Sequence, residues 1–116
     1  MLFRSGGGSL APENTLAALR TGHAYGFRAV EFDVMLSADA QPLLIHDATL
    51  ERTTNGRGAV GAHTLEQLAA LDAGSWFAPA FRGEPLPAFP AAAALCRSLG
   101  LLANRSEEHT SELQSH

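Results

Sequence analysis

The sequence predicts an α/β fold with a mainly parallel sheet. Segments with the two-residue period of a strand alternate with alanine- and leucine-rich segments typical of helices, and this alternation is characteristic of that fold class. The chain has 116 residues, of which 46% are hydrophobic and 17% charged, and its formal net charge is −4. These values predict one soluble, globular, mildly acidic unit and argue against nucleic-acid binding, which needs a basic surface.

Other protein classes are excluded by simple counts. No apolar run approaches the roughly 20 residues that a membrane span needs. The single cysteine, Cys96, cannot form an internal disulfide framework, and no group of cysteines and histidines has zinc-site spacing.

The first predicted helix covers residues 14–25 and is rich in alanine and leucine. Pro12 suits the first helical turn, Glu13 favours the positive end of the helix, and Gly26 is a suitable stop. The preceding residues 6–9 read as a flexible glycine-rich loop. This loop lacks both the GxGxxG pattern and the Lys-Ser/Thr pattern of phosphate-binding loops.

A strand is predicted over residues 29–36, because polar and apolar side chains alternate there. One face of this strand carries the apolar side chains of Val30, Phe32, Val34 and Leu36. A tight turn at 37–41 leads to a second short strand at 42–46. The turn is too short for a parallel crossover, which indicates a hairpin-like pair or a strand that leaves the main sheet.

The middle of the chain is expected to be rich in loops. Residues 47–61 contain turn signals, and residues 64–71 read as a short helix. Thr64 and Gln67 have the spacing of a capping box at the start of that helix. Residues 73–87 are predicted to form an ordered, aromatic-rich loop.

The last predicted elements are a helix at 88–99, which ends at Gly100, and an apolar strand that begins at 101–104. We expect the polar tail from residue 105 onward to interrupt this strand. The tail has no helical or strand period, so a disordered terminus is one interpretation.

The two ends of the chain share a second interpretation. Residues 2–5 can be encoded by CTC TTC CGA TCT, and the reverse complement of that string, AGA TCG GAA GAG, encodes residues 105–108. Both ends therefore resemble a translated sequencing-library adapter. On this interpretation residues 1–5 and 105–116 are excluded from fold reasoning, and residues 6–104 are the natural portion.

Glu31 and Asp33 are the leading candidates for chemistry. They are two residues apart on the predicted strand, so both side chains leave the same face. In an open sheet this face would simply meet water, whereas in a barrel it would look into the lumen. Two carboxylates in a lumen would bind a cation or share protons, and oxygen-only ligands suit Mg²⁺ or Ca²⁺.

His46 ends the second strand and precedes Asp47. A histidine at a strand end is commonly structural, but if it faces the same site, its pKa suits proton exchange with a reacting oxygen. The remaining histidines and two loop arginines are not expected to take part in chemistry. His23 and His63 are interpreted as solvated or capping residues. Arg52 and Arg57 could meet an anionic substrate, but solvated loop arginines are the favoured interpretation.

Together these motifs resemble a known family. The carrying segments, in order, are GGGSLAPENTLAAL, VEFDV, PLLIHDATLERTTNG, LDAGSWF and FRGEPLP. Over residues 6–104 they are similar to the N-terminal part of the glycerophosphodiester phosphodiesterase family, with the bacterial cytosolic type most alike. The resemblance implies part of a (β/α)₈ TIM barrel with a small insertion at about 47–79. It also implies cytoplasmic hydrolysis of a small-molecule glycerophosphodiester to glycerol 3-phosphate and an alcohol, with Mg²⁺ or Ca²⁺ as cofactor.

The resemblance assigns roles to five residues. Glu31 and Asp33 match the family's metal-binding Glu-x-Asp, and His46 matches its second catalytic histidine. Glu13 and Asp47 are expected to order the site rather than to act in chemistry. The aromatic pair Trp76 and Phe77 is expected to pack against the fold rather than to contact substrate.

The chain also departs from the family pattern. Arg4 and Ser5 occupy the positions of the family's first catalytic histidine and phosphate-binding arginine. After Asn104 the family carries a glutamate that is its third metal ligand, and Glu107, in the tail, is not assigned that role. We therefore expect the parent protein to be active and this chain to have little activity. Two alternatives are an inactive, poorly folded fragment and a non-catalytic binding module. The oligomeric state stays open.

Overall fold

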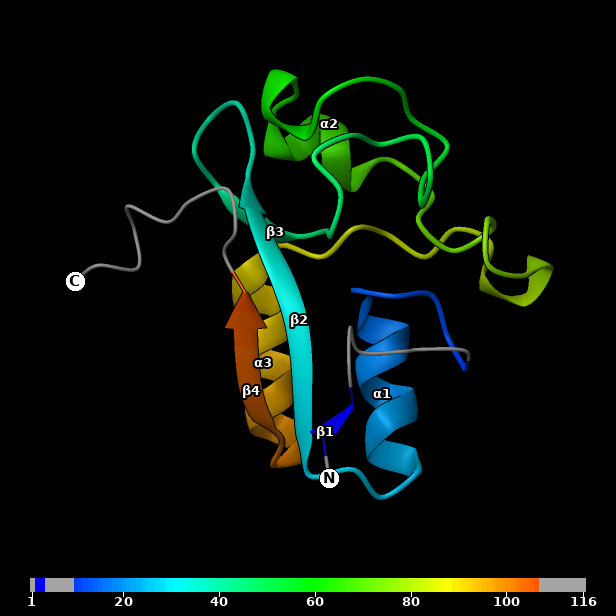
Figure 1. Cartoon of the computed structure of the whole chain (residues 1–116), viewed down its shortest axis with the longest axis vertical. Helices are drawn as coiled ribbons and strands as arrows, with labels where there is room; N and C mark the ends of the chain where they lie inside the picture. Colours follow the sequence, from blue (N-terminus) through cyan, green and yellow to red (C-terminus); the bar gives the residue numbers. More distant parts are fainter. Residues whose placement is uncertain (1, 4–9, 107–116) are drawn as a thin grey trace.

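The computed structural model describes residues 2–3 and 10–106, and it forms an α/β fold in which helices flank a short sheet (Figure 1). The predicted loop at 6–9, the two departures Arg4 and Ser5, and Glu107 with the tail that follows lie outside the described residues. None of the helices within 10–106 combines the length and apolar composition that a membrane crossing requires.

Strand β2 (Ala29–Leu36) is the centre of the sheet. It pairs in parallel with β1 (Leu2–Phe3) and with β4 (Leu102–Ser106), and antiparallel with β3 (Pro42–Leu44). The predicted parallel sheet and the predicted hairpin are both confirmed. The hairpin partner ends two residues earlier than expected, so His46 follows the strand instead of closing it.

Helices α1 (Leu16–Ala24) and α3 (Phe89–Leu99) pack on the apolar face of β2. The rings of Phe32 and Phe89 meet edge to face with centroids 6.2 Å apart. Helix α3 ends at Gly100, whose φ of +71° is a left-handed conformation that glycine adopts without steric cost. We call the following buried residues the sheet core: Leu19, Val30, Phe32, Val34, Leu44, Ala92, Cys96 and Leu101.

Helix α1 begins later than the sequence predicted. Asn14 has a φ of +57°, which is incompatible with a continuous right-handed helix, so Pro12 and Glu13 precede the helix rather than opening it. Thr15 is the N-cap: its hydroxyl accepts from the backbone N–H of Ala18 at 3.1 Å and donates to the Pro12 carbonyl at 2.8 Å. The Glu13 carboxylate therefore does not lie in the first turn of α1.

Residues 37–87 form a loop-rich region above the carboxyl end of β2 (Figure 1). This region holds α2 (Leu65–Ala69) and the short 3₁₀ helices η2 (Val60–Ala62) and η3 (Pro79–Phe81). The predicted capping box of Thr64 and Gln67 is confirmed, with both of its hydrogen bonds present. The region has its own buried cluster, which we call the loop core: Met35, Leu43, Ile45, Leu50, Val60, Leu68, Ala73 and Leu86.

The aromatic segment predicted at 73–87 is ordered around Gly74. A Cβ at this position would lie 1.9 Å from the Phe81 carbonyl oxygen, so the close approach of the two backbone segments requires glycine. The rings of Trp76, Phe77 and Phe81 stack edge to face along this loop, with successive centroids 5.6 and 5.7 Å apart. These contacts match the expected packing role, although Trp76 stays 39% exposed.

The sheet also includes backbone from the chain ends that the sequence interpretation left out of the fold. Leu2 and Phe3 pair with β2, and β4 continues through residues 105 and 106 instead of being interrupted. The physical reason is that parallel pairing uses backbone N–H and C=O groups, which every extended segment offers regardless of its side chains.

Candidate functional site

The site is built on the polar face of β2. Glu31 and Asp33 are partly exposed, while the intervening Val30, Phe32 and Val34 are buried in the sheet core. The predicted alternation is therefore confirmed over residues 29–34. It fails at residues 35 and 36, because Met35 is buried in the loop core and residue 36 is only partly buried. Strand β4 lies beside β2 in parallel, and its backbone register pairs residue 104 with Glu31 and residue 106 with Asp33.

Asn14, which the sequence interpretation did not single out, holds Asp33 in place. Its Nδ2 donates to Asp33 Oδ2 at 3.1 Å, and its Oδ1 accepts from the Asp33 backbone N–H at 2.9 Å. Asn14 is only 2% exposed and has the left-handed backbone that asparagine tolerates better than most residues. An asparagine immediately before a helix N-cap was the available signal, but its partner lies 19 residues away.

His46 lies next to this strand end because the hairpin brings β3 beside β2. The Ile45 backbone N–H donates to the Asp33 carbonyl at 3.1 Å, which continues the pairing past the end of β3. The His46 side chain is 51% exposed, and its Nδ1 lies 2.9 Å from Asp47 Oδ1. The hydrogen bond to Asp47 raises the pKa of His46, and the negative charges of Asp33 and Glu13 raise it further.

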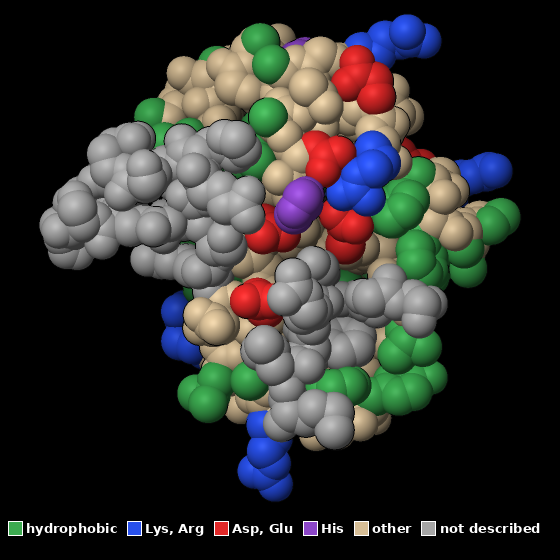
Figure 2. Space-filling model, viewed as in Figure 1, with side chains coloured by type: hydrophobic (Ala, Val, Ile, Leu, Met, Phe, Trp, Pro, Cys, Tyr) green, Lys and Arg blue, Asp and Glu red, His purple; other side chains and the backbone are tan. Residues whose placement is uncertain are grey.

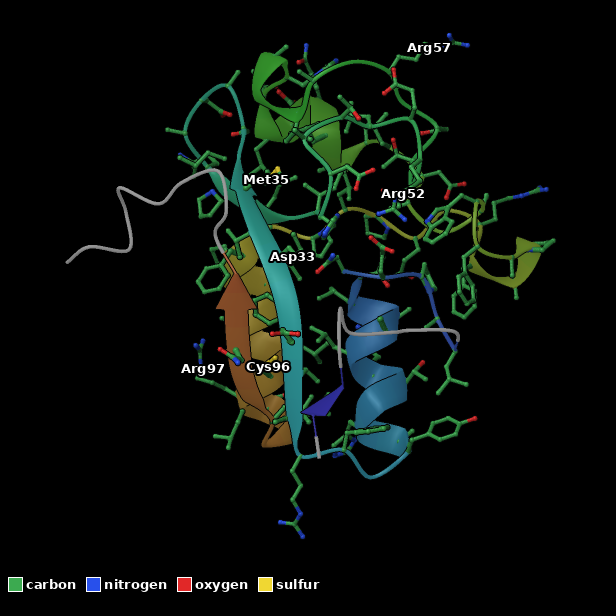
Figure 3. The ribbon with its side chains drawn as sticks, viewed as in Figure 1. Asp33, Met35, Arg52, Arg57, Cys96 and Arg97 are labelled. Atoms are coloured by element: carbon green, nitrogen blue, oxygen red, sulfur yellow. The ribbon has the colours of Figure 1, made fainter. Side chains whose placement is uncertain are left out.

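Arg52 corrects one prediction, since its side chain is not simply solvated. Its Nε and Nη2 donate to Asp47 at 2.9 and 3.0 Å, and its Nη2 and Nη1 donate to Glu13 at 2.7 and 3.2 Å. Arg52 hydrogen bonding is the main cause that lowers the pKa of Asp47 to about 2. In Figure 3 Arg52 points in among acidic side chains, whereas Arg57 extends outward from the loop region.

Four predicted residues therefore come together in one hydrogen-bonded arrangement or beside it. Arg52 joins Glu13 to Asp47, Asp47 is hydrogen-bonded to His46, and Asp33 influences His46 through its charge. A space-filling view shows a histidine side chain beside acidic and basic side chains in the middle of one face (Figure 2). A narrow crevice opens here, lined by Glu13, Asn14, Ile45, His46, Thr53, Ala73 and Leu86.

The donor set for a cation is only partly present. Glu31 and Asp33 offer carboxylate oxygens, which hard divalent cations prefer, and Asn14 engages Oδ2 of Asp33. Among the described residues, no three His, Cys, Asp or Glu side chains are grouped so that they could hold a metal ion. The two carboxylates therefore fit as part of a divalent-cation site rather than as a whole one.

Comparison with known proteins gives concordant matches. The model of the glycerophosphoryl diester phosphodiesterase family matches residues 5–116. A candidate glycerophosphodiester phosphodiesterase of Bacillus subtilis is 48% identical over 91 residues, which is 78% of this chain and 37% of that protein. The glycerophosphodiester phosphodiesterase of Caldanaerobacter subterraneus is 46% identical over 76 residues, which is 66% of this chain and 31% of that protein.

Solved structures are similar as well. A phosphodiesterase of Oleispira antarctica, in complex with the product sn-glycerol-3-phosphate, is 36% identical and superimposes with a TM-score of 0.92. The match covers 97% of this chain and 46% of that one. The chain thus spans less than half the length of each of these three relatives.

Proposed function

The chain belongs to the glycerophosphoryl diester phosphodiesterase family, and we propose that its site serves metal-assisted hydrolysis of a glycerophosphodiester to glycerol 3-phosphate and an alcohol. The observation that carries this proposal is the placement of His46 beside the Glu31–Asp33 face. The relative with bound sn-glycerol-3-phosphate supports the product class.

The architecture supports a barrel-type site. Strands β1, β2 and β4 are parallel, and α1 and α3 pack on one face of β2, as in a segment of a (β/α)₈ barrel. His46 and Asp47 follow the hairpin at the carboxyl end of β2, and active sites of such barrels are built at that end. We therefore propose that the Glu31–Asp33 face looks into the lumen of a barrel.

Glu31 and Asp33 would hold Mg²⁺ or Ca²⁺ through their carboxylate oxygens. When bound, the cation supplies positive charge that offsets the negative charge of the phosphodiester. Asn14 fixes the Asp33 carboxylate by a hydrogen bond and so orders one of these two ligands. The family's third carboxylate ligand, which the resemblance places after Asn104, is outside this pair.

His46 would exchange a proton with the attacking or leaving oxygen. Asp47 accepts a hydrogen bond from His46 Nδ1, which leaves the Nε2 of His46 for the substrate. The raised pKa of His46 increases its protonated fraction near neutral pH and so favours proton donation to the leaving alkoxide. Among the described residues, His46 is the histidine at this site; His23 is on α1 and His63 bonds the Ala59 carbonyl.

Cation binding tests the ligand assignment without requiring turnover. We expect titration with Mg²⁺ or Ca²⁺, followed by the amide signals of β2, to give weak saturable binding that Glu31→Gln or Asp33→Asn abolishes. Glu66→Gln, which changes an exposed carboxylate in the first turn of α2, is the matched control. Equal binding by the Asp33→Asn and Glu66→Gln variants would contradict the assignment.

Turnover is tested with a glycerophosphodiester that has a chromogenic leaving group. With two carboxylates and one histidine at the site, we propose that this chain turns over slowly and that His46→Ala lowers the rate a further ~10²–10⁴-fold. Substantial turnover abolished by Asp33→Ala would contradict the low-activity part of this proposal. Cation binding with no hydrolysis at all would favour the non-catalytic binding module.

We also propose that residues 6–104 are the natural portion and that the flanking segments derive from an adapter. Sequencing the source locus tests this proposal, because a genome that encodes both flanks in place would contradict it.

A further inference from the structure

Arg52 connects two carboxylates that come from different parts of the chain. Glu13 precedes α1 and lies 39 residues from Arg52, whereas Asp47 lies five residues before it in the loop-rich region. Each carboxylate receives two N–H groups, at 2.9 and 3.0 Å for Asp47 and at 2.7 and 3.2 Å for Glu13. The planar guanidinium is suited to two such forked contacts at once.

The turn that carries Arg52 is itself well anchored. Leu50 is fully buried in the loop core, and its carbonyl accepts from both the backbone N–H and the hydroxyl of Thr54, at 3.1 and 2.7 Å. Thr53 and Thr54 are 4% and 7% exposed. These bonds and this burial hold the backbone at Arg52 in place, so that its guanidinium reaches both carboxylates.

One oxygen of Asp47 contacts both Arg52 and His46. Asp47 Oδ1 lies 3.0 Å from Arg52 Nη2 and 2.9 Å from His46 Nδ1. Rotation of the Asp47 carboxylate would break its two bonds to Arg52, so Arg52 keeps Oδ1 directed at the imidazole. An ionised carboxylate can only accept hydrogen bonds, and neutral His46 must then carry its proton on Nδ1.

We propose that Arg52 is a positioning residue that sets the ring orientation and the tautomer of His46 through Asp47, with Glu13 as its second anchor. The catalytic meaning of this arrangement rests on the proposed function, because it presents Nε2 to the substrate. The arrangement itself is a property of the folded chain. Lysine could not replace Arg52, because a single ammonium group cannot make both forked contacts.

The test is the tautomer of His46, read from the ¹⁵N and ¹³C shifts of labelled histidine at about pH 9, where the ring is neutral. Signals are assigned with His46→Gln. We expect the Nδ1–H form to dominate in the full chain and the Nε2–H form to gain at least half of the population in both Arg52→Lys and Arg52→Gln. Glu13→Gln removes one anchor and should produce a smaller change in the same direction.

Arg57→Gln is the matched control, since Arg57 is an exposed arginine of the same loop region and should leave the tautomer unchanged. An unchanged Nδ1–H population in Arg52→Lys and Arg52→Gln would overturn the proposal. Loss of the folded amide spectrum in Arg52→Lys would also overturn it, because Arg52 would then be required for the fold rather than for His46.

These outcomes are separable from those of the proposed function. The expected tautomer changes together with an absence of hydrolysis would refute only the phosphodiesterase proposal. Hydrolysis that survives Arg52→Lys with an unchanged ratio of kcat to KM would refute only the role of Arg52.

Discussion

The parallel-sheet region and the loop-rich region of this molecule are held together differently. In the first, α1 and α3 cover one face of β2, and its buried side chains recur with the periods of a strand and of helices. The second, residues 37–87, has little regular structure and depends on a capping box, carboxylate caps such as Asp72, and the loop core. Both regions nevertheless have their own buried cluster.

The candidate site lies where these two regions meet. Asp33 and Met35 leave the same face of β2, yet Asp33 belongs to the site and Met35 to the loop core. Arg52 then connects Glu13 of the first region to Asp47 of the second. The difference between the regions teaches that the sheet supplies fixed carboxylates, whereas the loops supply the histidine and its partners.

The largest expected effect is on the sheet core. Phe32→Ala removes a fully buried ring from the strand that both regions share. We expect it to lower the free energy of unfolding by about 3–5 kcal/mol, measured by urea denaturation followed by circular dichroism. A loss below about 1 kcal/mol would contradict the central role of β2.

A cavity in the loop core should have a smaller and more local effect. Leu68→Ala should cost about 2–3 kcal/mol, because Leu68 is also fully buried but belongs to a short helix. Hydrogen exchange should show faster amide exchange within residues 42–86 and little change in α1 and α3. Equal acceleration in both regions would show that they unfold as one unit.

Substitution of Gly74 probes the close backbone approach in the aromatic loop. Gly74→Ala should cost about 2 kcal/mol, because the added Cβ would overlap the Phe81 carbonyl and force the backbone to shift. The fluorescence of Trp76 reports this movement. Gly61→Ala, where a Cβ would meet no atom within 4 Å, should leave stability and fluorescence nearly unchanged.

The helix caps compare the two regions directly. Thr15→Ala should cost about 1–2 kcal/mol, because it removes both a cap and a buried bond to the Pro12 carbonyl. Thr64→Ala, at the more exposed cap of α2, should cost less, at about 1 kcal/mol. Thermal unfolding measures both effects, and Thr15→Ser should restore most of the loss. The reverse order of the two costs would disagree with the burial of Thr15.

The smallest effect concerns acid stability. The pKa of Asp47 is lowered from 3.8 to about 2 in the folded chain, so its stabilising contribution is present above pH 4 and is lost as the pH falls toward 2. We expect a contribution of about 1 kcal/mol, reduced by the partial exposure of the Arg52 pair. In Asp47→Asn, stability should vary less between pH 4 and 2, as measured by urea midpoints.

The stabilising contribution of His46 has the opposite pH dependence. Its pKa is raised by Asp47, so its contribution is present at low pH and is lost as the pH rises through the folded value. Asp47→Asn should therefore also lower the pKa of His46 in an NMR titration. An unchanged His46 pKa would show that Asp47 does not govern the ring.

Much of the fold was predictable because local patterns and local chemistry agree. The alternation predicted over 29–36, the capping box at Thr64 and the glycine stop at Gly100 each describe short-range physics. The structure contains the last two in full and the alternation through residue 34. The start of α1 was mispredicted by a few residues, because Asn14 has a left-handed backbone and bonds Asp33. The asparagine before the N-cap does not reveal a partner that lies 19 residues away.

By itself the sequence determined the elements of this protein, its family and the face on which Glu31 and Asp33 stand, because periodicity and motif order are local properties. Only the tertiary structure decided that Asn14 orders Asp33 and that Arg52 joins Glu13 to Asp47. It also decided that extended backbone from both chain ends pairs with β2. The physical reason is the same in each case: hydrogen bonds between groups far apart in sequence depend on where the packed elements place them.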